Sequence, residues 1–381
     1  MTTLFLQSEI RNPYLFYDKM IAKNPVFWDE NSKIWAVYSY EYCAEILKNE
    51  NAHIPKLPFN PNLNRYALEI IDNLARLSNG VQHQITRETT NTLFSYMKNV
   101  GVDSILKELI NNEINQNQIN WVDSVCKKLP ILTVLKSFDF NENDCIFILE
   151  KIESFTKIML PQKTEEQIKF INEHAEEFYL KVEKHISTLE FYETLIFKIA
   201  EKHNIKKEEI IPIAVSNLIG LCIQSFDAGR GLLSNSLLQI LQNKNVKDKT
   251  EIEKSVIETL RFDPPIHNTR RIATEDFVIG ESLIQKGNAI LLVLASGNRD
   301  AEKFENASNF DPHRKNNHEN LTFGMGGHEC LAKYFSIHLT TETLWFLFTN
   351  YKTISLLENN IQYEPLINAR LPKNIWISIY N

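Results

Sequence analysis

The sequence predicts a mainly α-helical protein with small peripheral β-sheets. Most of the chain carries apolar residues at the spacing of helices, and only three short stretches alternate apolar and polar residues as strands do. The composition is that of an ordinary globular protein, with 43% hydrophobic and 23% charged residues. The sequence shows no internal repeat and no low-complexity linker. Residues 1–381 are therefore expected to form a single domain.

The expected strands lie at the two ends of the chain and in one stretch between them, at 25–40, 277–294 and 368–380. The apolar run at 209–240 carries charged and small residues in its middle. We therefore expect a buried central helix there rather than a membrane span, since a polar interruption is costly unless it lines a cavity. Helices are expected at 41–49, 66–77, 142–159, 164–186, 189–203, 207–242, 250–261 and 330–350.

The charge balance and the N-terminal segment limit the possible functions. The chain has 41 Lys and Arg against 48 Asp and Glu, a formal net charge of −7, and no long basic cluster of the kind that binds nucleic acid. Its first residues lack an apolar run long enough for a signal peptide or a membrane anchor. We expect a cytoplasmic protein with no nucleic-acid partner and no membrane anchor.

The cysteines direct attention to one loop. They are five in number, irregularly spaced and without a CxxC pair, which disfavours a disulfide framework and a structural zinc site. Cys330 differs from the rest because the glycines of "FGMGGHEC" (323–330) precede it and a helical pattern follows. A thiolate there gains from the free N–H groups and the helix dipole, which suits an axial metal ligand. The alternative is a buried structural thiol, as expected for Cys43, Cys126, Cys145 and Cys222.

The segment from Phe323 to Cys330 resembles the haem-binding loop of the cytochrome P450 family. The family pattern is Phe-Gly-x-Gly-x-His-x-Cys followed by x-Gly or x-Ala, and Ala332 fills the last position. Further motifs match in the family's order, so the resemblance covers nearly the whole chain. It implies a triangular helical fold, with haem between a long central helix and the helix of the Cys ligand. The further matches are Glu258 and Arg261 of a Glu-x-x-Arg helix, Arg314 in "FDPHR", "NRDAEKF" (298–304), His83 with Arg87, and Arg271.

The resemblance implies haem b, iron protoporphyrin IX, as the cofactor and Cys330 as the ligand of its iron. Haem carries two propionates, and buried carboxylates need cationic partners, which arginine supplies through charge-assisted hydrogen bonds. For any one of these residues the alternative is a surface charge or a histidine satisfied by its neighbours. The residues implied to bind the cofactor are His83, Arg87, Arg271, Phe323, His328 and Cys330.

Glu258 and Arg261 are expected to support the site rather than to take part in the chemistry. They stand one helical turn apart, so their side chains can meet. The resemblance implies that Arg314 joins them to brace the haem loop. The alternative is a solvated surface pair, which is common for an isolated Glu-x-x-Arg.

The same resemblance implies the reaction class. Thiolate ligation favours cleavage of the O–O bond, and the family inserts one oxygen atom into its substrate with two electrons from a redox partner. We therefore expect a monooxygenase acting on a small organic substrate in specialised metabolism. A ferredoxin with its ferredoxin reductase is the expected electron donor.

The central helix departs from the family's pattern, Ala-Gly-x-Asp/Glu-Thr, whose acid and threonine help deliver protons at the distal face of the haem. The matching stretch begins with Gln224 and reads QSFDA. The acid is retained as Asp227, but Ala228 stands in place of the threonine and has no hydroxyl group. Water, Ser225 or a substrate hydroxyl must then donate the hydrogen bond. Asp227, Ser225 and Ala228 are the expected catalytic positions.

Two alternatives to this monooxygenase remain. The first is a peroxide-using haem-thiolate peroxygenase, in which an arginine of the central helix holds a substrate carboxylate. Arg230 is the candidate, although Asp227 argues against it, and we expect Arg230 to face a partner or the surface. The second is a non-catalytic haem-binding protein, which the full set of motifs disfavours.

Overall fold

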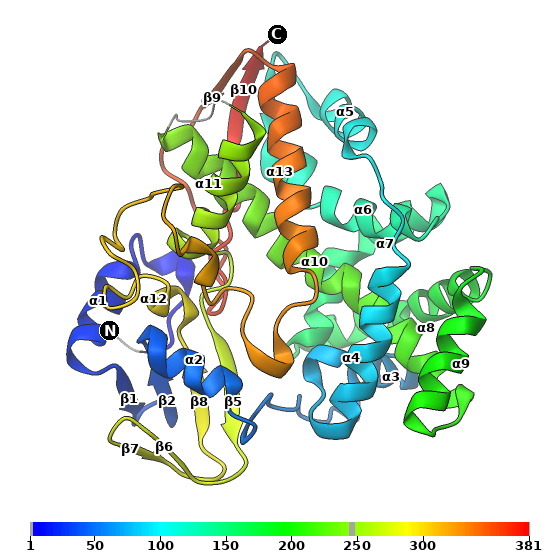
Figure 1. The fold of residues 1–381 in the computed structure, drawn as a ribbon. Coiled ribbons are helices and arrows are strands. Elements are labelled where there is room, and N and C mark those ends of the chain that lie inside the picture. The colour runs from blue at the N-terminus through cyan, green and yellow to red at the C-terminus, as the bar shows by residue number, and fades with distance from the viewer. Residues whose placement is uncertain (1–2, 244–247, 381) are drawn as a thin grey trace. The chain divides into compact units, whose positions relative to one another are not determined.

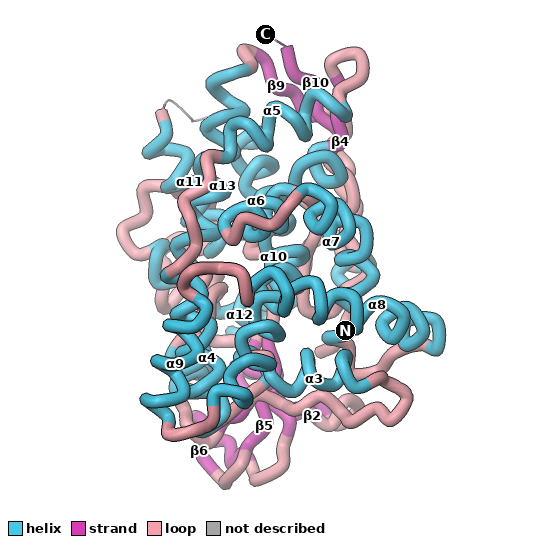
Figure 2. Tube along the Cα trace, turned by 90° about the vertical axis from the view of Figure 1, so that its right-hand side faces the viewer, coloured by secondary structure: helices cyan, strands magenta, loops and turns pink. Residues whose placement is uncertain are grey.

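The computed structural model describes residues 3–243 and 248–380, in which helices dominate and strands are short (Figures 1 and 2). The chain divides into two compact units. The first, here called the sheet unit, consists of Met1–His53, Val102–Lys127 and Asp227–Asn381. The second, here called the helical unit, consists of Ile54–Gly101 and Lys128–Phe226. The mainly helical fold is confirmed, while the single domain stays a prediction.

The main sheet of the sheet unit has the strand order β1-β2-β8-β5-β3. A hairpin builds its first two strands, in which Trp28 stands opposite Trp35 with ring centroids 5.4 Å apart. Strand β2 pairs parallel with β8, and the other neighbours are antiparallel. Helix α2 (Tyr40–Lys48) covers the sheet with Cys43, Ile46 and Leu47, which share one helical face. The strand bounds are β1 Val26–Asp29, β2 Ile34–Val37, β8 Ala289–Leu292, β5 Thr269–Ala273 and β3 Ala52–His53.

Two smaller sheets and further helices complete the sheet unit. Strands β6 (Phe277–Ile279) and β7 (Ser282–Ile284) form a hairpin around Gly280, whose φ of +58° favours glycine. A three-stranded sheet has the order β4-β10-β9. The remaining elements are η1 Gln7–Glu9, α1 Tyr14–Lys23, α5 Val102–Glu113, β4 Gln118–Asn120, η3 Val122–Cys126, α11 Lys249–Phe262, α12 Leu294–Gly297, η5 Asn317–Glu319, η6 Gly326–His328, α13 Lys333–Asn350, β9 Thr353–Leu356 and β10 Trp376–Tyr380.

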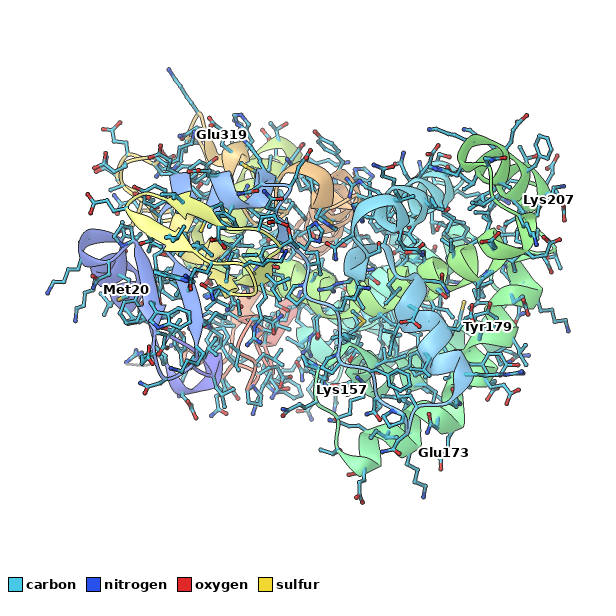
Figure 3. All side chains as sticks on the ribbon, turned by 90° about the horizontal axis from the view of Figure 1, so that it is seen from below. Met20, Lys157, Glu173, Tyr179, Lys207 and Glu319 are labelled. Atoms are coloured by element: carbon cyan, nitrogen blue, oxygen red, sulfur yellow. The ribbon has the colours of Figure 1, made fainter. Side chains whose placement is uncertain are left out.

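All described strands belong to the sheet unit, so the described part of the helical unit is built from helices. Helix α8 begins with a capping box in which Thr164 and Gln167 bond to each other's backbone. Tyr179 of α8, labelled in Figure 3, packs against Tyr66 and borders an open pocket of about 430 Å³. The elements are α3 Arg65–Asn73, η2 Ala75–Leu77, α4 Gly80–Ser95, α6 Leu129–Ser137, α7 Glu142–Phe155, η4 Thr156–Met159, α8 Glu165–Ile186 and α9 Tyr192–His203.

Helix α10 (Lys207–Asn243) contributes to both units, with the division between Phe226 and Asp227. Its length and apolar composition would suffice to cross a membrane, yet 72% of its most apolar window is buried within the protein. Such burial is expected of a core helix, as the sequence predicts. The helix is buried on both sides of a short stretch, 224–229, where five of six residues are only half-buried.

Most of the predicted helices are confirmed, and two kinds of difference have physical causes. The helix expected at 330–350 begins only at Lys333, because the glycine loop continues as turns through Ala332. Helix α6 was not predicted, because nearly every residue of "LPILTVLKS" is buried and a helix that is apolar all round shows no period.

One buried histidine of the sheet unit links folding to pH. His267 is fully buried, and its Nδ1 lies 3.1 Å from the hydroxyl oxygen of Tyr17. Its Nε2 has no hydrogen-bond partner among the described residues. Burial, together with the charges of Arg370 and Arg299, lowers the pKa of His267 well below its usual range. The folded protein therefore holds this ring neutral where an unfolded chain would protonate it.

We expect the free energy of unfolding to fall as the pH drops below about 6.5. In that range the histidine becomes protonated in the unfolded chain, whereas His267 stays neutral in the folded protein. The slope for one such group is up to about 1.4 kcal/mol per pH unit, and the group has no effect above that range. His267→Gln keeps a polar group beside Tyr17 and should flatten the slope in urea unfolding, whereas His318→Gln, at an exposed position, should not. Equal slopes for His267→Gln and the unmodified protein would contradict this account.

Candidate functional site

The loop before α13 sets Cys330 apart from the other cysteines. Four cysteines are buried, and Cys330 is exposed. The loop turns at Gly324 and Gly326, each with a φ of +70°, a conformation that side chains rarely adopt. A Cβ added to Gly326 would lie 3.1 Å from the carbonyl oxygen of Leu47, so this glycine also lets the loop pack against α2. The loop is closed by the backbone N–H of Cys330, which donates to the carbonyl of Phe323 over 2.8 Å.

Burial keeps the other four thiols protonated. Burial raises the pKa of Cys126 and of Cys222 to about 12, and it raises the pKa of Cys43 and Cys145 above the usual range. These four thiols therefore stay neutral at physiological pH. Among the described cysteines, Cys330 is the exposed one and is therefore the candidate for a thiolate ligand.

Around Cys330 the protein surface is partly apolar. Leu331, Phe335 and Ile337, in and beside the first turns of α13, stay half-buried, whereas Leu339, Leu344 and Leu347 further along are buried. The N-cap of α13, Ala332, has no side chain that could bond to the helix's first N–H groups. A flat apolar ligand beside Cys330 would cover these side chains and gain from the burial of their surface.

Arg271, on β5, is a buried cation that no carboxylate of the described residues pairs with. The residue is 4% exposed, and its guanidinium donates to the carbonyl of Arg270 over 2.8 Å and to the Thr269 hydroxyl over 3.3 Å. No carboxylate of residues 3–243 or 248–380 forms an ion pair with it, and burial lowers its pKa to about 10. A buried guanidinium of this kind is stabilised by an anionic ligand. Together with the apolar surface and the exposed thiol, it fits the propionates, ring and iron of haem.

The other predicted cofactor residues divide between the two units. Phe323 and His328 are half-buried in the same loop as Cys330. His83 and Arg87 belong to the helical unit, four residues apart on α4 and therefore on one face. His83 Nδ1 lies 3.0 Å from the carbonyl oxygen of Ala75, which can only accept, so the neutral ring carries its proton on Nδ1. Within the sheet unit the structure thus brings together Phe323, His328 and Cys330, with Arg271 on the sheet.

The predicted distal residues lie on the half-buried stretch of α10. The Ser225 hydroxyl donates to the carbonyl of Cys222 over 3.1 Å, and the Gln224 amide donates to the carbonyl of Gly220 over 3.0 Å. Both side chains are thus bonded to their own helix. The Asp227 side chain is 38% exposed, and Ala228 is half-buried. Since its single proton is already donated, the Ser225 hydroxyl can only accept in this conformation.

The expectation that Arg230 faces a partner or the surface is wrong. Arg230 is 4% exposed. Its Nη2 lies 3.1 Å from Asp227 Oδ1, one helical turn away, and its Nη1 lies 3.5 Å from Glu364 Oε1. Next to it, the chain segment that ends at Leu371 packs directly on α10 at Gly231, where an added Cβ would meet Leu371 at 2.4 Å.

Glu258 and Arg261 of α11 form a fully buried ion pair. Two hydrogen bonds join them, from Arg261 Nη2 to Glu258 Oε1 over 2.6 Å and from Nε to Oε2 over 3.0 Å. Arg314 approaches the same carboxylate, with Nε 3.6 Å from Oε1. Arg261 also donates to three backbone carbonyls, those of Asn298, Ala307 and Asn309. The geometry is that of a structural brace, as the sequence predicts.

The sequence motifs alone assign no role to Asn298, which connects this brace to the loop that carries Cys330. Its Oδ1 accepts from the Leu321 N–H over 2.6 Å, and its Nδ2 donates to the Thr322 hydroxyl over 2.9 Å. That hydroxyl donates to the carbonyl of Leu260, at the end of α11. The signal for Asn298 was present in "NRDAEKF", where it is the first residue.

Known proteins share both sequence and fold with this chain. The family model "Cytochrome P450" matches residues 239–355. The putative cytochrome P450 YjiB of Bacillus subtilis (strain 168) is 25% identical over 385 residues, which cover 92% of each chain. Cytochrome P450 119 of Sulfolobus acidocaldarius is 27% identical over 347 residues, covering 84% of this chain and 86% of the relative.

The same architecture occurs in a solved structure. The crystal structure of P450BioI in complex with hexadec-9Z-enoic acid ligated acyl carrier protein has a TM-score of 0.83 to this chain at 23% identity, covering 98% of this chain and 99% of that one. The family model, the curated relatives and this shared fold agree with the loop of Cys330 and the Glu258–Arg261 pair. These matches indicate a cytochrome P450, an oxidoreductase of the monooxygenase type.

Proposed function

We propose that the chain binds haem b through the Cys330 thiolate and oxidises a small organic substrate without the usual threonine in its proton relay. The observation that carries this proposal is the exposed thiol of Cys330 on a closed glycine loop, in the same unit as the buried cation Arg271. When bound, thiolate-ligated haem supplies the activation of dioxygen that is typical of the family. The protein's own residues bind the haem, orient it and move protons.

Charged and polar side chains would hold the propionates. Arg271 is buried and has no carboxylate partner within the described ranges, so it suits a propionate directly. His83, Arg87 and His328 are the further donors that we assign to the propionates. The carbonyl of Phe323 accepts a hydrogen bond from the backbone N–H of Cys330. This bond would help to orient the Cys330 side chain.

The proton relay would depend on Asp227 and on a group that the protein does not supply. The half-exposed Asp227 carboxylate can take a proton from water and release it again. Ala228 offers no hydroxyl group, and the Ser225 hydroxyl already donates to its own helix. We therefore assign the missing donor to an ordered water or to a hydroxyl of the substrate.

The peroxygenase alternative loses its candidate residue. An arginine that holds a substrate carboxylate must be available to it, whereas Arg230 is buried and ion-paired with Asp227 and Glu364. These pairings support dioxygen and reductase rather than peroxide as the source of oxidising power.

For partners we propose a ferredoxin and its reductase as electron donors, a cytoplasmic location, one functional domain over residues 1–381, and a role in specialised metabolism. The P450BioI structure contains an acid carried by acyl carrier protein. A substrate screen for this chain should therefore present candidate acids both free and carrier-bound, using spectral shifts of the haem as the readout.

Coupling of electron use to product formation tests the relay. With a surrogate ferredoxin system, Ala228→Thr should improve coupling for substrates that lack a suitably placed hydroxyl, because it restores the missing donor, and should change little for the native substrate. Ala228→Val has the shape of threonine without its hydroxyl and is the matched control. Asp227→Asn should slow the reductase-driven reaction about 10²-fold or more, as loss of a general acid does, but spare a peroxide-driven one, since peroxide brings its own protons.

Two results would overturn the proposal in favour of its alternative. Peroxide alone would have to give faster turnover of the native substrate than reductase and dioxygen. Arg230→Ala would also have to abolish that turnover in a protein that still loads haem.

A further inference from the structure

Arg230 is shared between two carboxylates, and this sharing bears on how Asp227 can move. We propose that Glu364 is a positioning residue for the proton relay: it keeps Arg230 paired when Asp227 turns away from it to carry a proton. This inference rests on the proposed function, in which Asp227 is the acid of the relay.

The exposures of the three side chains distinguish their roles. Arg230 is 4% exposed, whereas the side chains of Asp227 and Glu364 are 38% and 23% exposed. The cation is therefore fixed and dry, and the carboxylate most open to water is Asp227. The distances are 3.1 Å from Arg230 to Asp227 and 3.5 Å to Glu364. Cys126 also lies near Arg230, but burial raises its pKa to about 12, so its thiol is neutral and supplies no negative charge.

Glu364 is held beside Arg230 by the backbone. Its N–H donates to the carbonyl of Leu371 over 2.8 Å. Leu371 packs against α10 at Gly231, the residue after Arg230, where no Cβ would fit. Next to Leu371, the carbonyl of Arg370 accepts a hydrogen bond from the side chain of Asn235, one turn further along α10. None of these contacts involves Asp227, so the segment that carries Glu364 is held on α10 independently of the Asp227 side chain.

Burial makes the second carboxylate necessary. Removing one partner from a buried ion pair is strongly destabilising, because the other charge is left without compensation. If Asp227 alone balanced Arg230, its departure would be opposed by that penalty, and so would its protonation. With Glu364 in place, protonated Asp227 is neutral and the remaining pair, Arg230 and Glu364, is neutral as well. Asp227 can then take up a proton from water and release it again, and the buried charge of Arg230 keeps a counter-charge throughout.

A double-mutant cycle on stability tests the sharing without any substrate. Asp227→Asn and Glu364→Gln should each lower the thermal midpoint slightly, because one carboxylate remains on Arg230. The double variant should lose several degrees more than the sum of the two, because both of these carboxylates have lost their charge. Glu358→Gln, an exposed change in the same segment, is the control and should add nothing to either. If the loss in thermal midpoint of the double variant equals the sum of the two single losses, the proposal is overturned.

Turnover tests the role in the relay. Glu364→Gln should release several-fold more hydrogen peroxide per electron pair and show a larger solvent deuterium isotope effect, with the carbon monoxide band and the peroxide-driven rate unchanged. If Glu364→Gln releases as much hydrogen peroxide and shows the same solvent isotope effect as the unmodified protein, the proposal is overturned. This holds even if Asp227→Asn is impaired as expected. If Asp227→Asn itself couples normally, the relay of the proposed function fails, and the role of Glu364 in it fails too.

Discussion

Cys330→Ala should abolish the red-shifted Soret band that reduced haem-thiolate protein gives with carbon monoxide. The expected loss is complete, because no other cysteine can replace the ligand. The other four thiols are buried, and burial raises the pKa of each above its usual range. Any haem that still binds the apolar surface beside α13 would lack the thiolate that defines the band.

The measurement is the reduced carbon monoxide difference spectrum with haem content determined in parallel. Cys43→Ala, which removes a buried thiol from the core under the main sheet, should keep the band. Cys330→His should bind haem with an imidazole-type spectrum. A thiolate band retained by Cys330→Ala would show that another group ligates the iron.

Glu258→Ala should cost roughly 3–5 kcal/mol of stability, because it leaves the fully buried guanidinium of Arg261 without a counter-charge. Arg261→Ala should cost as much, since it leaves Glu258 charged and buried and also frees the carbonyls of Asn298, Ala307 and Asn309. Both variants should yield less folded, haem-loaded protein.

The control for this prediction lies on the same helix. Glu253 of α11 is exposed, so Glu253→Ala should change stability by about 0.5 kcal/mol or less. Thermal or urea unfolding and the haem content distinguish a structural role of the Glu258–Arg261 pair from a role in the chemistry. Full stability and full haem content in Glu258→Ala, combined with loss of turnover, would mean that the pair acts in the chemistry instead of supporting the loop.

The sequence predicted the glycine loop before Cys330 and the Glu258–Arg261 pair well because their geometry depends on residue types at fixed local spacings. Gly324 and Gly326 both need φ > 0, and Glu258 and Arg261 meet across one helical turn. Such features can be read from a single chain segment. Spacing also placed His83 and Arg87 on one helical face.

The misjudged residues depend on segments that are distant in sequence. Beside Arg230, α10 packs at Gly231 against Leu371 and Pro265, which lie far along the chain. Glu364 reaches it only because that segment folds back onto the helix. No local pattern around Arg230 indicates either contact, and a charged residue in a helix is more often exposed. The start of α13 was misplaced for the opposite reason, because the apolar pattern of a helix does not mark where its loop ends.

The brace has a consequence for the order in which the protein is assembled. Arg261 gathers three carbonyls from residues 37 to 48 positions further along the chain, and Asn298 ties the start of the haem loop to the end of α11. Closing loops of this length costs chain entropy, which these protein–protein hydrogen bonds offset. We therefore expect the frame around the loop of Cys330 to form before the cofactor docks on it.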